Sequence, residues 1–268
     1  MRTASKRSVL GVGINPTSYE EVCMLCRNWV QQARLRKPDI TSGRYVCVTS
    51  VHGIMTARSD HAFRRILNQA DLATPDGMPV VWALRSFGCR RQQRVYGPRL
   101  MLALCEQAAR LNHRVFLYGT RPETLEVLHR NLLAQFPTLA ITGMYAPPFR
   151  PLTPEEDREV IARILASGAE LVFVGISTPK QEYWMAAHKA VLPGRVMLGV
   201  GAAFDFHAGQ VRQAPAWMQR NGLEWFYRLL MEPQRLWRRY LFHTPVFLPL
   251  WFLQLAGILY QGDYKTRD

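Results

Sequence analysis

The stretch LATPDGMPVVWALRSFG, residues 72–88, contains the pattern from which we predict the fold. Its first residues are typical of a short buried strand that runs into a turn, and Asp76 and Gly77 occupy the tip of that turn. Residues 78–87 have the apolar density of a buried helix, and Pro79 falls in its first turn, where a missing N–H is harmless. A carboxylate between a strand end and a helix N-terminus is placed for chemistry. The alternative role is a helix cap, and the Asp-Gly pattern alone favours capping.

Strand and helix patterns alternate on both sides of this stretch, as far as about residue 200. Such alternation implies βαβ units and a mostly parallel sheet. We therefore predict the α/β class, with a Rossmann-like sheet flanked by helices. The expected strands are 9–14, 45–49, 71–75, 114–118, 140–145, 171–175 and 195–199, and the expected helices are 17–34, 54–68, 78–87, 99–112, 122–136, 153–167 and 180–190.

The sequence changes character after about residue 208. Between residues 212 and 243, arginines stand among aromatic residues, and six arginines face two glutamates. We predict a core over residues 1–208 and a basic, aromatic helical appendage over residues 209–268 that associates with a membrane. The basic and aromatic residues in question are Arg212, Trp217, Arg220, Trp225, Phe226, Tyr227, Arg228, Arg235, Trp237, Arg238, Arg239 and Tyr240.

The end of this appendage is apolar. Residues 244–260 carry apolar side chains in the main, with Gln254 as the exception. The segment is slightly short for a membrane span, and two prolines and a glycine interrupt it. We therefore expect it to lie in the membrane interface or to dip into it, and not to cross the bilayer.

The formal net charge of +14 calls for an acidic partner, which can be nucleic acid, a phosphate-bearing substrate or an anionic membrane surface. No zinc-finger or RNA-recognition pattern occurs, so we do not expect nucleic acid as a partner. The N-terminus has no apolar run long enough for a signal peptide, and the odd number of five cysteines indicates a reducing cytosol. We expect a cytoplasmic protein, bound peripherally to the inner face of the cytoplasmic membrane.

Cys23 and Cys26 match the C-x-x-C pattern, but they lie in an amphipathic helical segment with no second pair and no histidine cluster. We interpret them as buried, reduced thiols and not as a redox or zinc site. No H-x-H, D-x-D or H-E-x-x-H pattern supports a metal site. We expect neither a metal nor a cofactor.

Two glycine-containing turns follow predicted strands, at the edge of a parallel sheet where ligands bind. Gly119 and Thr120 connect a strand to a helix start, where backbone N–H groups and the helix dipole could meet a phosphate. Neither turn is a G-x-G-x-x-G or a P-loop, and each alone could be an ordinary turn, but two in one chain favour a nucleotide-type ligand. The second turn begins at Gly175 and adds a hydroxyl, a cation and an amide, from Ser177, Lys180 and Gln181.

Two further side chains follow predicted strands. Asp205 lies after a run of small residues. The sequence favours a binding role for it no more than a structural role as a turn or cap residue. His52 follows the second predicted strand and is the best placed of the histidines.

Several ordered motifs together resemble one known family. They are TPDGMPVVW (74–82), RVYGP (94–98), FLYG (116–119), GISTPKQE (175–182) and GVGAAFD (199–205), continued by APAW (214–217), GLEW (222–225) and EPQR (232–235). From about residue 9 to residue 240 the chain resembles the WecG/TagA/CpsF family, glycosyltransferase family 26.

The resemblance implies a metal-independent, inverting transfer of a sugar, hexose or N-acetylmannosamine in type, from a UDP-sugar to a polyprenyl-pyrophosphate-linked saccharide. Enzymes of this family build teichoic acid linkage units, enterobacterial common antigen or exopolysaccharide. By analogy Asp76 is the general base and Gln181 contacts the donor. The turns at Gly119 and Gly175 would line the UDP site, and arginines of the appendage would close over the active site at the membrane.

Two residues depart from the family pattern and leave the identity of the donor sugar open. Ser50 stands where the family usually has Asn, and Arg99 stands where members commonly carry Asp. With Lys180, Arg212 and Arg220 as candidate cations for the diphosphate, the predicted substrate-binding residues are Thr49, Ser50, His52, Gly77, Gly97, Arg99, Tyr118, Gly119, Thr120, Gly175, Ser177, Pro179, Lys180, Gln181, Asp205, Arg212 and Arg220.

Two rival functions remain at this point. A nucleotide-dependent oxidoreductase could use a similar sheet, although the missing G-x-G-x-x-G pattern counts against it. A non-catalytic basic protein could bind nucleic acid, in which case no UDP would be released. Homo-oligomer formation stays open.

Overall fold

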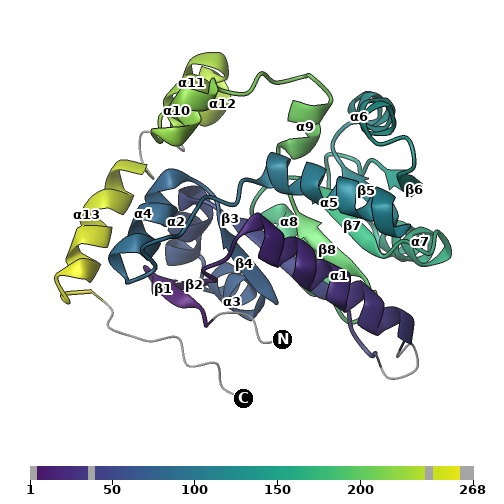
Figure 1. Ribbon diagram of the computed structural model, residues 1–268, viewed down its shortest axis with the longest axis horizontal. Helices are drawn as coiled ribbons and strands as arrows, with labels where there is room; N and C mark the ends of the chain where they lie inside the picture. Colours follow the sequence, from purple (N-terminus) through teal and green to yellow (C-terminus); the bar gives the residue numbers. More distant parts are fainter. Residues whose placement is uncertain (1–4, 36–39, 239–243, 260–268) are drawn as a thin grey trace. The chain divides into compact units, whose positions relative to one another are not determined.

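The computed structural model describes residues 5–35, 40–238 and 244–259 (Figure 1). The chain divides into two compact units. The first unit contains residues 1–18, 48–96 and 213–268, and the second contains residues 19–47 and 97–212. Most of the expected appendage therefore groups with the segment that carries Asp76, and a boundary at residue 208 stays a prediction. Arg239, Tyr240 and Tyr260, which we assigned to the appendage, lie outside the described residues.

The second unit is built on parallel strands, as the alternating pattern predicts. Four pairs of neighbouring strands run parallel: β3–β8, β8–β7, β7–β5 and β5–β6. Its elements are α1 (Tyr19–Leu35), β3 (Arg44–Thr49), α5 (Gly97–Leu111), β5 (Arg114–Gly119), α6 (Pro122–Gln135), β6 (Ala140–Tyr145), α7 (Pro154–Ala166), β7 (Leu171–Gly175), α8 (Lys180–His188), β8 (Val196–Gly199) and α9 (Ala203–His207).

The central strands are continuous apolar runs because both of their faces are covered. Every residue of β7 and β8 is buried, as is β5 after its first residue. Helices α1 and α5 lie side by side over the strands (Figure 1). Helix α1 contacts α5, and its buried residues occupy positions i, i+3, i+4 and i+8, the pattern of an amphipathic helix. Those buried residues are Val22, Leu25, Cys26 and Val30.

The first unit carries β4, which lies next to β3, and the last two residues of β3, Val48 and Thr49, belong to this unit as well. The elements of this unit are β1 (Arg7–Val9), β2 (Val12–Ile14), α2 (Val51–Ser59), α3 (His61–Gln69), β4 (Leu72–Pro75), α4 (Met78–Ser86), α10 (Ala216–Arg220), α11 (Glu224–Met231), α12 (Pro233–Arg238) and α13 (Thr244–Leu255).

Two expected elements of the first unit are each divided in two. The single strand expected at 9–14 is the antiparallel hairpin β1–β2, because Leu10 and Gly11 take left-handed backbone conformations and reverse the chain. The single helix expected up to residue 68 breaks at Asp60, whose backbone is extended. The side chain of Asp60 accepts a hydrogen bond from the N–H of Phe63 and so begins α3 as a new helix.

Helix α13 is apolar, yet one polar side chain fastens it to the hairpin. The Oε1 atom of Gln254 accepts a hydrogen bond from Leu10 N, and its Nε2 atom donates to Ser8 O, both at 2.9 Å. Phe247 is fully buried on the same side, where α13 lies against α2 and α4 (Figure 1). Within the described parts of the chain, we find no helix with the length and apolar character that a membrane crossing requires.

All five cysteines are free thiols. Cys26 is buried in α1 and Cys23 is half-buried, in agreement with a structural role for this pair. Burial raises the pKa of Cys23 to about 11 and that of Cys105 to about 12, and it raises the pKa of Cys26 as well.

We expect Cys26 and Cys105 to resist alkylation in the native protein, because the thiolate is the reactive form and both thiols are buried. Mass spectrometry after iodoacetamide treatment at pH 8, with and without denaturant, measures this. Labelling of either residue at the same rate in the native and the denatured protein would refute the expectation.

Candidate functional site

Asp76 lies in the turn between β4 and α4, as the sequence predicts. Its N–H donates to the carbonyl oxygen of Thr49 at 2.9 Å, which ties the turn to the end of β3. Gly77 is the N-cap residue of α4, with a φ of +92°, and Pro79 lies in the first helical turn. The N-cap position therefore belongs to Gly77 and not to Asp76.

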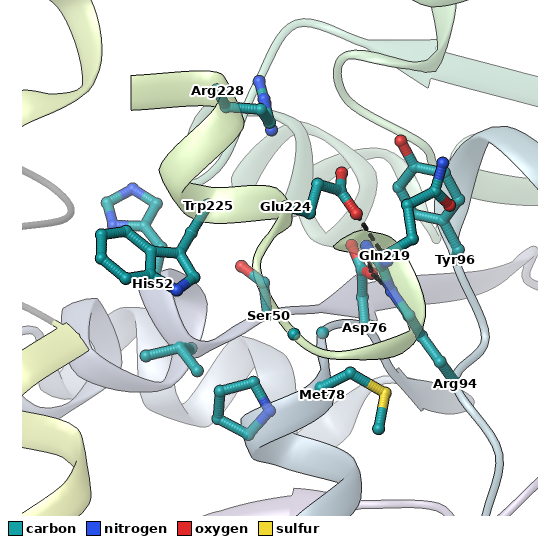
Figure 2. A pocket seen from close by; sticks show the side chains of 14 residues that line it. Ser50, His52, Asp76, Met78, Arg94, Tyr96, Gln219, Glu224, Trp225 and Arg228 are labelled. Carbon is teal, nitrogen blue, oxygen red and sulfur yellow. Dashed lines mark hydrogen bonds and ion pairs between the residues drawn. The ribbon is translucent and has the colours of Figure 1, made fainter. Parts of the chain in front are cut away.

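A pocket opens in the first unit around Asp76 (Figure 2). Segments far apart in the sequence contribute to it: the start of α2, the β4–α4 turn, the loop that follows α4, and the segment from α10 to α11. The wall of the pocket contains both polar and apolar side chains, so the pocket can bind a ligand that has polar and apolar parts. The lining residues are Ser50, Val51, His52, Asp76, Gly77, Met78, Pro79, Arg94, Tyr96, Gln219, Gly222, Glu224, Trp225 and Arg228.

Arg94 is the electrostatic centre of this pocket. Its Nε and Nη2 atoms contact Oδ1 of Asp76 at 3.0 and 2.9 Å, and its Nη1 atom donates to Oε2 of Glu224 (Figure 2). The guanidinium also lies over the ring of Tyr96, 4.0 Å from its centroid. Burial alone would lower the pKa of Arg94, but the charges of Asp76 and Glu224 outweigh it and raise that pKa. Arg94 therefore stays protonated between two carboxylates.

The segment from α10 to α11 rests closely on α4. Gly222 has a φ of +73°, and a Cβ atom there would lie 3.2 Å from Cβ of Met78 and 3.0 Å from the ring of Trp82. Glycine is the residue that fits both the left-handed conformation and this short approach. This approach brings Glu224, Trp225 and Arg228 to the wall of the pocket.

The two glycine turns of the second unit lie against each other. A Cβ atom on Gly119 would lie 2.6 Å from the carbonyl carbon and oxygen of Gly175. Thr120 and Ser177, which follow the two glycines, both have left-handed backbone conformations. The Oγ1 atom of Thr120 donates to Oδ1 of Asp205 at 3.2 Å, so the structure brings Asp205 to the first of these turns.

Comparison with known proteins identifies the chain. Residues 7–259 match the sequence model of the family described as "Glycosyl transferase WecG/TagA/CpsF family". The chain belongs to this family. Two relatives are named N-acetylglucosaminyldiphosphoundecaprenol N-acetyl-beta-D-mannosaminyltransferase. The Bacillus subtilis protein is 32% identical over 242 residues, which is 90% of this chain and 88% of the relative. The Bacillus spizizenii protein is 32% identical over 203 residues, 76% of this chain and 77% of the relative.

The resemblance read from the motifs is thereby confirmed, and this WecG/TagA/CpsF member is a glycosyltransferase. The family match spans both units, because it includes the pocket around Asp76 and the glycine turns at Gly119 and Gly175. Within the described residues, no group of three or more His, Cys, Asp or Glu side chains is arranged to hold a metal ion.

Gln181, the expected donor contact, is buried and already bonded. Its Oε1 atom accepts from Gly201 N at 3.0 Å, and its Nε2 atom donates to Glu182 at 2.9 Å. The side chain thus supports the backbone after β8. A direct contact between Gln181 and the donor stays a prediction.

The remaining predicted residues differ in how accessible they are. Tyr118 is only 1% exposed and stacks on Trp184 with ring centroids 4.3 Å apart, which is a core position. Arg99 is exposed on α5, with its guanidinium over the ring of Tyr19. For these residues a substrate contact stays a prediction. Gly97 is the buried first residue of α5, and Pro179 immediately precedes α8. The predicted substrate-binding residues that are exposed to solvent are Arg99, Ser177, Lys180, Arg212 and Arg220.

The pocket contains side chains that the sequence-based site prediction did not include: Arg94, Tyr96, Glu224, Trp225 and Arg228. Arg94 is 18 residues from Asp76 and 130 residues from Glu224. No local spacing indicates such contacts. The family motifs that contain these residues indicated that the segments matter. A motif does not show which side chains contact one another.

Proposed function

We propose that this glycosyltransferase moves an N-acetylmannosamine-type sugar or a hexose from a UDP-sugar to a polyprenyl-diphosphate-linked saccharide. The observation that carries the proposal is the pocket in which Asp76 stands beside Arg94, inside the family match. The names of the two relatives support the sugar and the acceptor, since both are N-acetylmannosaminyltransferases that act on an N-acetylglucosaminyl-diphosphoundecaprenol.

Asp76 acts as the general base in this proposal. Its carboxylate accepts the proton of the acceptor hydroxyl while the hydroxyl oxygen attacks the anomeric carbon of the donor. The bond to UDP breaks on the opposite face, so the configuration inverts. General-base assistance of this kind contributes about 10²–10⁴-fold in rate.

Cations and helix N-termini stabilise the departing diphosphate. Arg228 is our first candidate, because it lines the same pocket as Asp76, whereas Arg94 already lies between two carboxylates. The lack of a D-x-D motif supports a mechanism without a metal ion. Lys180, Arg212 and Arg220 remain the other proposed cations.

A panel of UDP-sugars, scored by UDP release with and without a lipid-diphosphate-linked acceptor, tests the function. We expect release from one UDP-sugar, stimulation by the acceptor, and no loss of rate in EDTA. Release from none of the sugars by a folded protein would overturn the proposal. Loss of activity in EDTA that added Mg²⁺ restores would overturn metal independence alone.

We also propose that the C-terminal segment holds the enzyme at the inner face of the cytoplasmic membrane. One side of α13 is fastened by Phe247 and Gln254, and residues 244–259 contain no charged side chain. The opposite side is an exposed apolar surface, here named the C-terminal apolar face. It consists of Val246, Leu248, Phe252, Leu253, Leu255 and Ile258.

Membrane binding is expected to weaken when this face becomes polar. Because each large apolar side chain contributes about 1.5–3 kcal/mol on burial, the triple substitution of Leu248, Phe252 and Ile258 by Ser should reduce binding at least about tenfold. Co-sedimentation with vesicles containing anionic phospholipid measures it. Leu35→Ser is the matched control, since Leu35 is 84% exposed in the other unit. Equal co-sedimentation of the triple variant and the wild type would contradict membrane docking by this face.

A further inference from the structure

Glu224 makes a contact that the transfer mechanism does not use. It is the first residue of α11, and its side chain is only 11% exposed although it is charged. Its Oε2 atom accepts from Nη1 of Arg94, on the guanidinium that also contacts Asp76 (Figure 2). A buried carboxylate that shares an arginine with another carboxylate is costly to place. The cost of this arrangement indicates that Glu224 has a functional role.

The guanidinium of Arg94 is oriented by contacts on three sides. Its Nε–Nη2 edge faces Oδ1 of Asp76, its Nη1 end faces Glu224, and its plane lies over the ring of Tyr96. With Nη1 held by Glu224, the guanidinium presents one edge to a single oxygen of Asp76. It does not form the fork in which both ends of an arginine grip one carboxylate.

We propose that Glu224 is a positioning residue for Asp76 and acts through Arg94, an inference that rests on the proposed function of Asp76 as the base. An arginine beside a carboxylate stabilises its ionised form and makes it a weaker base. A second carboxylate on the same arginine offsets part of that effect. Glu224 therefore lets Arg94 orient Asp76 without removing the basicity that proton transfer needs.

Other charged and titratable groups around the pocket also influence the ionisation of Asp76. Arg228 has Glu232 as a partner at 3.7 Å, so part of its charge is already balanced. Burial, followed by the charges of Glu224 and Asp76, raises the pKa of Tyr96, which keeps its hydroxyl neutral. The charged and titratable residues that line the pocket with Asp76 are His52 from α2, Arg94 and Tyr96 from the loop after α4, and Glu224 and Arg228 from α11.

The pH dependence of kcat in the variant Glu224→Gln tests this role. Once the offsetting charge is gone, the acidic limb of the profile is expected to move about one unit to lower pH. On the plateau, kcat is expected to fall roughly three- to tenfold, because a weaker base accepts the proton less readily. The KM for the UDP-sugar should stay near that of the wild type.

Two companion variants make the result specific. Asp71→Asn removes the same charge before the opposite end of β4, about 17 Å along the strand from Asp76, and should leave the acidic limb in place. Glu224→Asp keeps the charge and should recover most of the wild-type pH position. A folded Glu224→Gln enzyme whose kcat falls while the acidic limb of its pH profile stays in place would overturn the proposal. An acidic limb at the same pH in Glu224→Asp and Glu224→Gln would overturn it too.

The result also separates this inference from the function on which it rests. A wild-type enzyme that transfers sugar, together with a Glu224→Gln profile unchanged in pH position, removes the role of Glu224 and leaves the role of Asp76. A wild-type protein that transfers no sugar from any UDP-sugar removes both.

Discussion

Replacing Asp76 by Asn is expected to lower kcat by about 10²–10⁴-fold, because the amide cannot accept the proton of the acceptor hydroxyl. The substitution preserves the size of the side chain and its position in the turn after β4. Steady-state UDP release in the presence of acceptor measures the loss, and calorimetry with UDP measures donor binding. We expect donor binding to stay close to that of the wild type.

Asp71→Asn is again a suitable control, since it removes a carboxylate just before the same strand. It should keep near wild-type kcat. If Asp76→Asn turned over at a rate close to that of the wild type while binding UDP normally, Asp76 would not be the base. If both variants lost activity equally, the loss would reflect the net charge of the unit and not proton transfer.

Replacing Gly119 by Ala is expected to give the second largest effect, on stability and on donor binding together. The added Cβ would lie 2.6 Å from the backbone of Gly175, so the ends of β5 and β7 would have to separate. The φ of +143° adds backbone strain for any residue with a side chain. We expect a loss of about 3 kcal/mol in the free energy of unfolding and at least about tenfold weaker binding of UDP.

Gly88→Ala separates steric conflict from backbone strain. Gly88 has a φ of +95°, and a Cβ atom there would meet nothing within 4 Å. This variant should lose only about 1–2 kcal/mol, the cost of the left-handed conformation. Denaturant unfolding of both variants gives the comparison. Equal losses in the two would show that the approach of Gly119 to Gly175 does not matter for stability.

The fold was largely predictable because its strands and helices have clear local signals. The strands at Arg114–Gly119 and Leu171–Gly175 are short apolar runs that end in glycine, and the helix at Pro154–Ala166 begins with the capping box of Thr153 and Glu156. The hairpin at Leu10 and Gly11 was missed, because an apolar run does not show where it reverses. The break at Asp60 was missed because Phe63 stands where a capping box has Glu or Gln.

The site was predictable only where its residues are local to one turn. Asp76 was found because a strand, a turn and a helix follow one another within a short stretch. The contact of Gly119 with Gly175 depends on the pairing of β5 with β7, although β6 lies between them in the chain. The contacts of Arg94 with Asp76 and Glu224 depend on how α11 packs beside the β4–α4 turn, which is a tertiary property.

The most direct test of the account is a transfer assay with defined substrates. The purified chain is incubated with UDP-N-acetylmannosamine and an N-acetylglucosaminyl-diphospholipid, and the lipid product is analysed by mass spectrometry and NMR. The account predicts a product heavier by one N-acetylhexosamine, with an anomeric configuration opposite to that of the donor, and at least about 100-fold slower formation of this product by Asp76→Asn. A folded wild-type protein that binds UDP but adds no sugar to the lipid, from this donor or any other UDP-sugar, would contradict it.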